Sequence, residues 1–354
     1  MEMTKFLTQK NRMWLFAVLG LFMVSTVIFI DILAHAPWGK PGDMREVVVP
    51  SGSSLSTISD SLKKQNIIQS KAWFEFYVQL KGRSGSLRPG IFQLPENASF
   101  TQVIHTLTEG TPEVVKVTIV EGLQAREIAK ILAKKFAFTD SEFMAIVNDS
   151  DLAQQWGLPS NSLEGFLYPE TYKFFKNQTP KGIAHQMVNQ FFTTIPDSFS
   201  IRAKKYGWTL EEAVTLGSII EGEVMRDEER PLISSVYHNR LKRGMRLQAD
   251  PTIQYIIEDG PRRLFTKDLE VESPYNTYLH SGLPPGPISN PGYGSIKAAL
   301  YPEKSNYLYF VARGDGYHTF SRTNREHINA KRHLQQLRRQ LSLEQKKKKN
   351  ESTL

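Results

Sequence analysis

The sequence predicts an α+β protein with one N-terminal transmembrane helix, a small α+β region and a larger, mostly helical domain with a small β-sheet. Three observations support this fold class. An uncharged apolar run extends from Met13 to Ile30, short β-branched runs alternate with amphipathic helical patterns as far as Phe136, and helical periodicity dominates after it. The composition, 40% apolar and 23% charged residues, is typical of a folded protein.

The apolar run near the N-terminus can span a membrane. As a helix it would be about 27 Å long, close to the thickness of the hydrocarbon layer. Cationic residues precede it, so we expect residues 1–12 in the cytoplasm, a transmembrane helix at 13–33 and a tether at 34–45. A cleaved signal peptide is the alternative, because Ala34-His35-Ala36 resembles a cleavage site, but the run exceeds the usual ~7–15 residues. We therefore expect a single-pass protein of the cytoplasmic (inner) membrane with an extracytoplasmic (periplasmic) main part.

The excess of positive charge lies at the two ends of the chain. The formal net charge is +8, and residues 331–354 carry eight Lys or Arg against Glu344 and Glu351. The central part is balanced, so a basic nucleic-acid groove is not supported. We expect 331–354 to be a basic tail that is solvated or contacts anionic lipid or wall polymer.

The first folded region is expected at 46–136. Val47 to Val49 predict a strand, an amphipathic helix follows, a second helix covers Lys71 to Lys81, and Gly90 to Phe92 predict a return strand. A similar strand, glycine and helix recur from Val117 onward. This recurrence is either a duplicated module or a coincidence between two amphipathic helices.

The second region is expected at 137–330. Its helical patterns lie near 140–148, 180–192, 198–206, 209–225 and 228–243, followed by a helix at 295–300 and a strand at 307–312.

The helix expected from Thr209 carries a candidate catalytic acid. Thr209 and Glu212 form a capping-box pattern, which fixes the helix register. In that register Glu221 shares a face with apolar residues, whereas Glu223 lies about 200° away around the helix. A carboxyl group held against apolar surface keeps its proton near neutral pH and can donate it to a glycosidic oxygen.

A structural role for the same carboxylate is the alternative. Glu221 could form an ion pair with Arg226 or Arg230 near the end of the helix. Structural ion pairs also bury carboxylates, so the pattern alone leaves both readings open.

Two polar motifs follow this helix. Gln248 and Asp250 lie at an expected strand-to-helix junction, where Asp250 is an N-cap candidate. Tyr275, Asn276 and Thr277 combine an aromatic face with amide and hydroxyl groups, which stack on sugar rings and bind their hydroxyls. A plain turn would also use Asn and Thr.

No metal or cofactor is predicted. The sequence has no cysteine and no HExxH pair, and its eight histidines are scattered. His318 and His327 are therefore expected to have structural or hydrogen-bonding roles. No GxSxG, P-loop or GxGxxG motif occurs either.

Eight segments together resemble one family. They are EGFLYPETY at 164–172, SIIEGE at 218–223, HNRL and GMRLQADPTIQY between 238 and 255, YNTY at 275–278, GLPPGPISNPG at 282–292, YLYFVA at 307–312 and HTFSRTNREH at 318–327. These motifs are similar to those of the YceG-like endolytic murein transglycosylases. The sequence departs from the family pattern at Gly222, Val224 and Glu170.

The resemblance implies a membrane-anchored peptidoglycan lytic transglycosylase. It implies LysM-like modules at 46–136 and a catalytic domain at 137–330. It also implies cleavage of the MurNAc–GlcNAc β-1,4 bond, which leaves 1,6-anhydroMurNAc at the new terminus and stops strand elongation. It selects Glu221 as the acid and base, needs no cofactor, and gives as partners peptidoglycan strands, the membrane and peptidoglycan synthases. The candidate substrate-binding residues are Glu164, Glu223, Gln248, Asp250, Tyr275, Asn276, Thr277 and His318.

Two other functions remain open at this point. One is a wall hydrolase that uses Glu221 with a second carboxylate, Asp250 or Glu164, and releases reducing ends. The other is a non-catalytic scaffold that holds glycan and recruits synthases.

Overall fold

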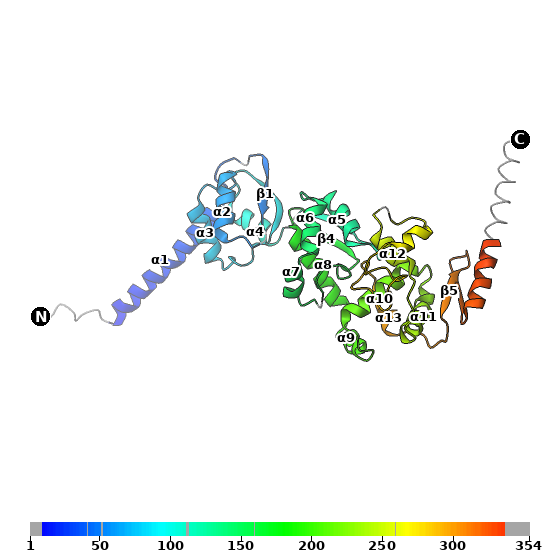
Figure 1. Ribbon diagram of the computed structural model, residues 1–354. Helices are drawn as coiled ribbons and strands as arrows, with labels where there is room; N and C mark the ends of the chain where they lie inside the picture. Colours follow the sequence, from blue (N-terminus) through cyan, green and yellow to red (C-terminus); the bar gives the residue numbers. More distant parts are fainter. Residues whose placement is uncertain are drawn as a thin grey trace, which may run out of the picture. The chain divides into compact units, whose positions relative to one another are not determined.

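The computed structural model describes residues 9–336 except 41, 51, 111–112, 159 and 259, with side chains from Trp14 onward (Figure 1). The chain divides into two compact units, Met1–Val115 with Lys173–Gln178, and Lys116–Tyr172 with Thr179–Leu354. Most of the expected cytoplasmic segment at 1–12, and all of the basic tail beyond residue 336, lie outside the described residues.

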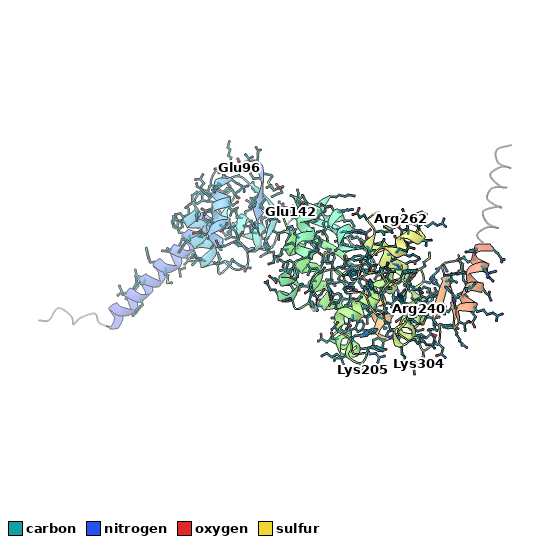
Figure 2. All side chains as sticks on the ribbon, in the orientation of Figure 1. Glu96, Glu142, Lys205, Arg240, Arg262 and Lys304 are labelled. Atoms are coloured by element: carbon teal, nitrogen blue, oxygen red, sulfur yellow. The ribbon has the colours of Figure 1, made fainter. Side chains whose placement is uncertain are left out.

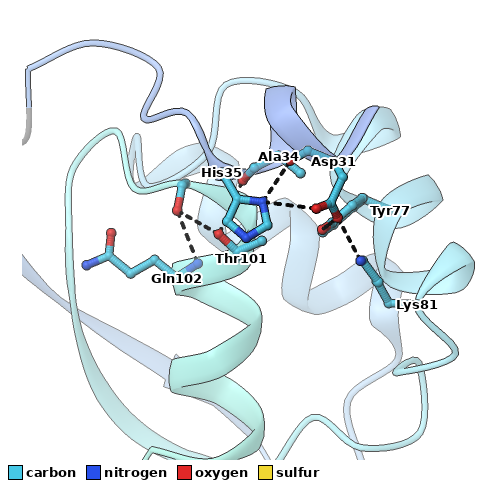
Figure 3. Close-up of polar contacts among 8 residues, drawn as sticks. Asp31, Ala34, His35, Tyr77, Lys81, Thr101 and Gln102 are labelled. Atoms are coloured by element: carbon cyan, nitrogen blue, oxygen red, sulfur yellow. Dashed lines mark hydrogen bonds and ion pairs between the residues drawn. The ribbon is translucent and has the colours of Figure 1, made fainter. Parts of the chain in front are cut away.

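The N-terminal helix α1 covers Gln9–His35 and contains one candidate membrane span, Trp14–His35, with a mean hydropathy of 2.5. Its length and composition are compatible with a single-pass anchor. The helix extends into the segment expected to be a tether, and Ala34 is buried in the core of the first unit. Asp31 accepts hydrogen bonds from Tyr77 Oη at 2.9 Å and Lys81 Nζ at 2.7 Å (Figure 3). The end of the helix is therefore packed against the folded unit rather than joined to it only by a linker.

The first unit has the predicted strand–helix–helix–strand order. Strand β1 (Met44–Val49) pairs antiparallel with β2 (Gly90–Pro95), and α2 (Leu55–Lys64), α3 (Lys71–Leu80) and α4 (Phe100–Thr108) pack with it. Helix α4 was not predicted. Its β-branched Thr, Val and Ile residues lower helix propensity, but a Ser99 cap and a buried apolar face outweigh that cost.

The strand–glycine–helix pattern recurs as the sequence suggests. Strand β3 (Val114–Thr118) precedes α5 (Ala125–Ala133), and Gly52 and Gly122 both have positive φ, 78° and 81°. Strand β3 pairs with β4 (Thr171–Phe175), which was not predicted, and the boundary between the two units runs through both strands. The two segments around Gly52 and Gly122 therefore share a local conformation, while their origin by duplication stays a prediction.

The second unit is mostly helical. The predicted helices form within a few residues of their expected bounds, as α6 (Asp140–Val147), α8 (Pro180–Thr194), α9 (Asp197–Lys204), α10 (Leu210–Glu223), α11 (Arg230–Lys242) and α13 (Tyr293–Leu300). Helix α12 (Asp250–Ile256) forms at the expected strand-to-helix junction, whereas α7 (Ser150–Gln155) and the 3₁₀ turns Asp227–Glu229 and Thr266–Glu270 were not predicted as elements. The hairpin of β5 (Tyr309–Ala312) and β6 (His318–Ser321) supplies its small sheet.

Helix α10 is the centre of this unit. Every residue from Ala213 to Ile220 is buried, and α9, α11, α12 and α13 pack around it. At Gly217 an added Cβ would lie 3.2 Å from the Ile296 Cα, so the glycine allows the close approach of α13. The last turn of α10 carries two carboxylates, Glu221 and Glu223, on different sides of the helix.

Candidate active site

The capping box predicted at the start of α10 is present. Thr209 N donates to Glu212 Oε2 at 2.7 Å, and Glu212 N donates to Thr209 Oγ1 at 3.1 Å. The helix ends at Glu223, two residues before the expected end, because Val224 has extended backbone angles. Glu221 and Glu223 therefore occupy its last turn, on different sides as predicted.

The surroundings of Glu221 correct the sequence-based interpretation, since its carboxylate does not face apolar neighbours. Its two oxygens accept hydrogen bonds from Arg230 Nη1 at 2.9 Å and from the Gly292 backbone N–H at 2.9 Å. The Glu221 and Arg230 side chains are 8% and 12% exposed. Arg230 also pairs with Asp227 at 2.9 Å and donates to Ser295 Oγ. Glu221 thus joins the end of α10 to α11 and to the start of α13.

Glu223 lies in a different environment. Its carboxylate accepts a hydrogen bond from Tyr237 Oη at 2.9 Å and lines a cavity of about 500 Å³, here named the Glu223 cavity. Desolvation by the surrounding protein raises the pKa of Glu223 to about 7; the Asp250 charge adds to this rise, and the Tyr237 hydrogen bond and Arg240 oppose it. A carboxyl with this pKa can both hold and release a proton near neutral pH.

Gln248 and Asp250 line the same cavity. Gln248 has a positive φ of 49° and is fixed by a backbone hydrogen bond to the Thr277 carbonyl. Asp250 is not the N-cap, and no strand precedes it: Ala249 is the N-cap of α12, and Asp250 is its first helical residue. The Asp250 carboxylate instead accepts a hydrogen bond from Tyr278 Oη.

The hairpin of β5 and β6 forms another wall. His318 lines the cavity and is held by Glu229, which accepts from the His318 backbone N–H at 3.0 Å and lies 2.8 Å from Nδ1. Arg240 of α11, labelled in Figure 2, donates to the Leu308 and Leu247 carbonyls and lies 5.2 Å from the centre of the Tyr309 ring. These contacts fix the hairpin to α11.

Four other candidates lie outside this cavity. Glu164 is buried, accepts from the Ala125 backbone N–H and from Asn290 Nδ2, and has its pKa raised to about 8 by burial. Glu164 and Tyr275 line a separate cavity of about 530 Å³.

Asn276 and Thr277 are buried, and their side chains form hydrogen bonds within the protein. Asn276 Nδ2 donates to the Leu269 and Val271 carbonyls, and Thr277 Oγ1 accepts from the Ala249 backbone N–H.

Sequence reasoning missed part of the cavity wall. Tyr237, Tyr278, Tyr309 and Arg240 line it but were named only as members of motifs or not at all. Three tyrosines and Phe310 give it aromatic faces suited to sugar rings. In the part of the chain that the structure describes, no three His, Asp or Glu side chains gather to hold a metal ion.

Together, these groups can bind a polar ring-shaped ligand and transfer a proton to it. Glu223 has a pKa raised to about 7, Tyr237 orients it, and aromatic and amide side chains surround it. This is the arrangement expected for acid catalysis on a sugar.

Comparison with known proteins gives consistent matches. Residues 47–333 match the YceG-like family. An endolytic murein transglycosylase of Bacillus subtilis strain 168 is 36% identical over 299 residues, which are 80% of this chain and 82% of the relative. One from Streptococcus pneumoniae strain D39 is 28% identical over 80% of this chain and 58% of its own length. A crystal structure of a YceG-like protein from Listeria monocytogenes aligns with a TM-score of 0.57 at 34% identity, over 81% of this chain and 98% of that one.

Proposed function

We infer that this chain, which belongs to the YceG-like family, is an endolytic murein transglycosylase. It is a lytic transglycosylase, a lyase that acts on peptidoglycan. The family match covers residues 47–333, which include Glu223 and all but one of the residues that line the Glu223 cavity.

We propose that Glu223, rather than the predicted Glu221, is the catalytic acid and base. The observation that carries this proposal is a carboxyl with a pKa raised to about 7 at the wall of a cavity large enough for sugar rings. Glu221 differs from it, because both of its oxygens are engaged by Arg230 and Gly292. Glu221 as the acid remains the alternative, and a direct comparison of the two glutamine variants distinguishes them.

The proposed reaction needs one proton-transfer residue. Protonated Glu223 donates its proton to the oxygen of the MurNAc–GlcNAc β-1,4 bond as the bond to C1 of MurNAc breaks. The C6 hydroxyl of the same MurNAc then attacks C1, and the Glu223 carboxylate accepts the proton of that hydroxyl. The products are a free GlcNAc 4-hydroxyl and a 1,6-anhydroMurNAc end, and Glu223 is again protonated.

Asp250 supports a second candidate reaction, because it lines the same cavity as Glu223. A hydrolase normally needs two carboxylates, one of which manages water or forms the covalent intermediate. We propose instead that Asp250, held by Tyr278 Oη, binds a sugar hydroxyl.

Mass spectrometry of the digestion products tests this choice. Purified strands should yield anhydro ends that borohydride does not reduce. Reducible MurNAc ends as the main product would contradict the transglycosylase reaction and favour hydrolysis by Glu223 and Asp250.

We further propose how the enzyme is positioned in the cell. Helix α1, with its apolar run, is the single anchor in the inner membrane, residues 1–12 are cytoplasmic, and the remainder is periplasmic. The regions at 46–136 act as LysM-like modules that hold glycan, the catalytic domain covers 137–330, and the enzyme ends strand elongation beside peptidoglycan synthases. A reporter fused after the C-terminus should behave as extracytoplasmic, and a mature N-terminus near Pro37 would contradict the uncleaved anchor.

A further inference from the structure

The end of the described chain is part of the cavity wall. Residues 324–336 form a helix, drawn in orange-red beside β5 in Figure 1, although residues 331–354 were expected to be a tail. Asn324, His327, Lys331 and Leu334 follow one another at spacings of three and four, so they share one helix face. All four line the Glu223 cavity, and Leu334 is buried. The helix is therefore a structural part of the candidate active site.

His327 presents a polar group that lacks a partner. Its ring stacks on Tyr309 with a centroid distance of 5.1 Å and an interplanar angle of 24°. Its Nδ1 atom is buried and has no hydrogen-bond partner among the described residues. Burial, with Lys331 and Arg240 nearby, lowers the pKa of His327 to about 4, so the ring is neutral at neutral pH. A neutral imidazole has one donor and one acceptor, and a buried nitrogen without a partner in a cavity wall is a position for a ligand group.

Lys331 supplies a cation one helical turn further on. Its side chain is exposed and forms no hydrogen bond or ion pair with any part of the chain that the structure describes. Arg240, the other cation of the wall, already donates to the Leu308 and Leu247 carbonyls. Sugar hydroxyls and acetamido groups are neutral, whereas a carboxylate forms a stronger, charge-assisted hydrogen bond with a lysine. The helix at 324–336 therefore brings a positive charge that can bind an anion to the cavity that also contains Glu223 and Asp250.

We propose that the helix at 324–336 recognises a carboxylate carried by the glycan substrate. Lys331 pairs with that carboxylate, and His327 hydrogen-bonds a neighbouring polar group of the same unit. The inference rests on the proposed function, because peptidoglycan is the substrate that brings such groups to this cavity. Two sources share this chemistry: the carboxylates of the stem peptide, and the lactyl carboxylate of a MurNAc from which the peptide has been removed.

The test uses the full chain in detergent and two purified, uncrosslinked substrates: strands that carry stem peptides, and peptide-free strands whose lactyl carboxylates are free. Lys331→Ala should raise KM about tenfold, the effect of losing one charged hydrogen bond, and leave kcat nearly unchanged. Lys331→Arg should retain most of the affinity. Arg332→Ala is the matched control, because it removes the same charge from the same helix at a position that does not line the cavity. A KM for Lys331→Ala equal to that of the control on both substrates would overturn the proposal.

Substrates with altered charge identify the ligand. When all carboxylates are converted to amides, the wild type should fall to the level of Lys331→Ala, and the variant should lose nothing more. If Lys331→Ala raises KM relative to the wild type as much on amidated strands as on unmodified strands, the proposal is overturned. A difference in KM between wild type and Lys331→Ala on the peptide-bearing strands alone assigns the stem peptide, and a difference on the peptide-free strands alone assigns the lactyl carboxylate.

His327→Phe tests the second contact, because phenylalanine keeps the stacking on Tyr309 and removes both ring nitrogens. We expect KM to rise several-fold with an unchanged melting temperature; an unchanged KM would overturn the role of His327. If the wild type itself releases no anhydro ends, the proposed function fails. If the wild type is active and the variants match it, only this inference fails.

Discussion

The raised pKa of Glu223 predicts that the free energy of unfolding falls as pH rises from 4.5 to 8, and that Glu223→Gln removes this dependence. In the unfolded chain a glutamate has a pKa near its ordinary value of 4.5, whereas in the folded protein that of Glu223 is about 7. Between these values the folded state binds one proton that the unfolded state does not, so the free energy of unfolding falls as pH rises. The stabilisation is complete below pH 4.5 and is lost as pH rises through 7.

The size of the effect follows from the shift of about 2.5 pKa units. At 1.36 kcal/mol per unit, the wild type should lose about 3 kcal/mol from this group between pH 4.5 and pH 8. Glu223→Gln does not titrate and can still accept the hydrogen bond from Tyr237, so it should escape this loss. The variant should therefore be equal to the wild type near pH 4.5 and more stable than it at pH 8.

Urea denaturation of both proteins across this pH range, followed by tryptophan fluorescence, measures the difference. Trp156 and Trp208 report on the second unit, which contains Glu223. Glu164 also has a raised pKa, but it is present in both proteins and cancels in the comparison. A difference between the two proteins that is constant from pH 4.5 to pH 8 would refute the raised pKa of Glu223.

Three further predictions concern the same unit. Because the first step needs protonated Glu223, kcat/KM should fall as pH rises through about 7 in wild-type assays, and a flat profile to pH 9 would contradict this. Glu221→Gln should lower the free energy of unfolding by roughly 1–3 kcal/mol, because it leaves the largely buried Arg230 with a weaker partner. Asp227→Asn, at an 87% exposed side chain, should change it by less than about 0.5 kcal/mol. Activity should survive EDTA, and a loss that zinc restores would refute metal independence.

Local patterns predicted most of the elements but not the partners of the two carboxylates. The capping box at Thr209 gave the correct register of α10, and that register correctly separated Glu221 from Glu223. The error was to predict apolar neighbours for the Glu221 carboxylate, which instead contacts Arg230 and the Gly292 backbone N–H. Helix α10 is buried on all sides from Ala213 to Ile220, so hydrophobic periodicity could not tell which side faces a cavity.

The remaining differences between the sequence-based predictions and the structure arise from contacts between residues far apart in the sequence. Gly292, whose backbone N–H binds Glu221, lies 71 residues further along the chain, and no local rule relates the two. Asn276 and Thr277 were interpreted as sugar ligands from their residue types, whereas in the structure Asn276 donates to the Leu269 carbonyl and Thr277 accepts from the backbone N–H of Ala249, the N-cap of α12. Residues 331–336 were assigned to a tail from their charge, although Leu334 of this helix is buried.

The most direct test of the account compares the turnover of two glutamine variants. Wild type, Glu223→Gln and Glu221→Gln are assayed at equal folded concentration for release of anhydro-muropeptides from purified strands. Glu223→Gln should reduce turnover by ~10²–10⁴-fold with its fold intact, as expected when general acid–base catalysis is lost. Glu221→Gln should lose stability and keep most of its activity per folded molecule. The opposite ranking, with Glu223→Gln near wild type and a well-folded Glu221→Gln inactive, would contradict the assignment and restore Glu221 as the acid.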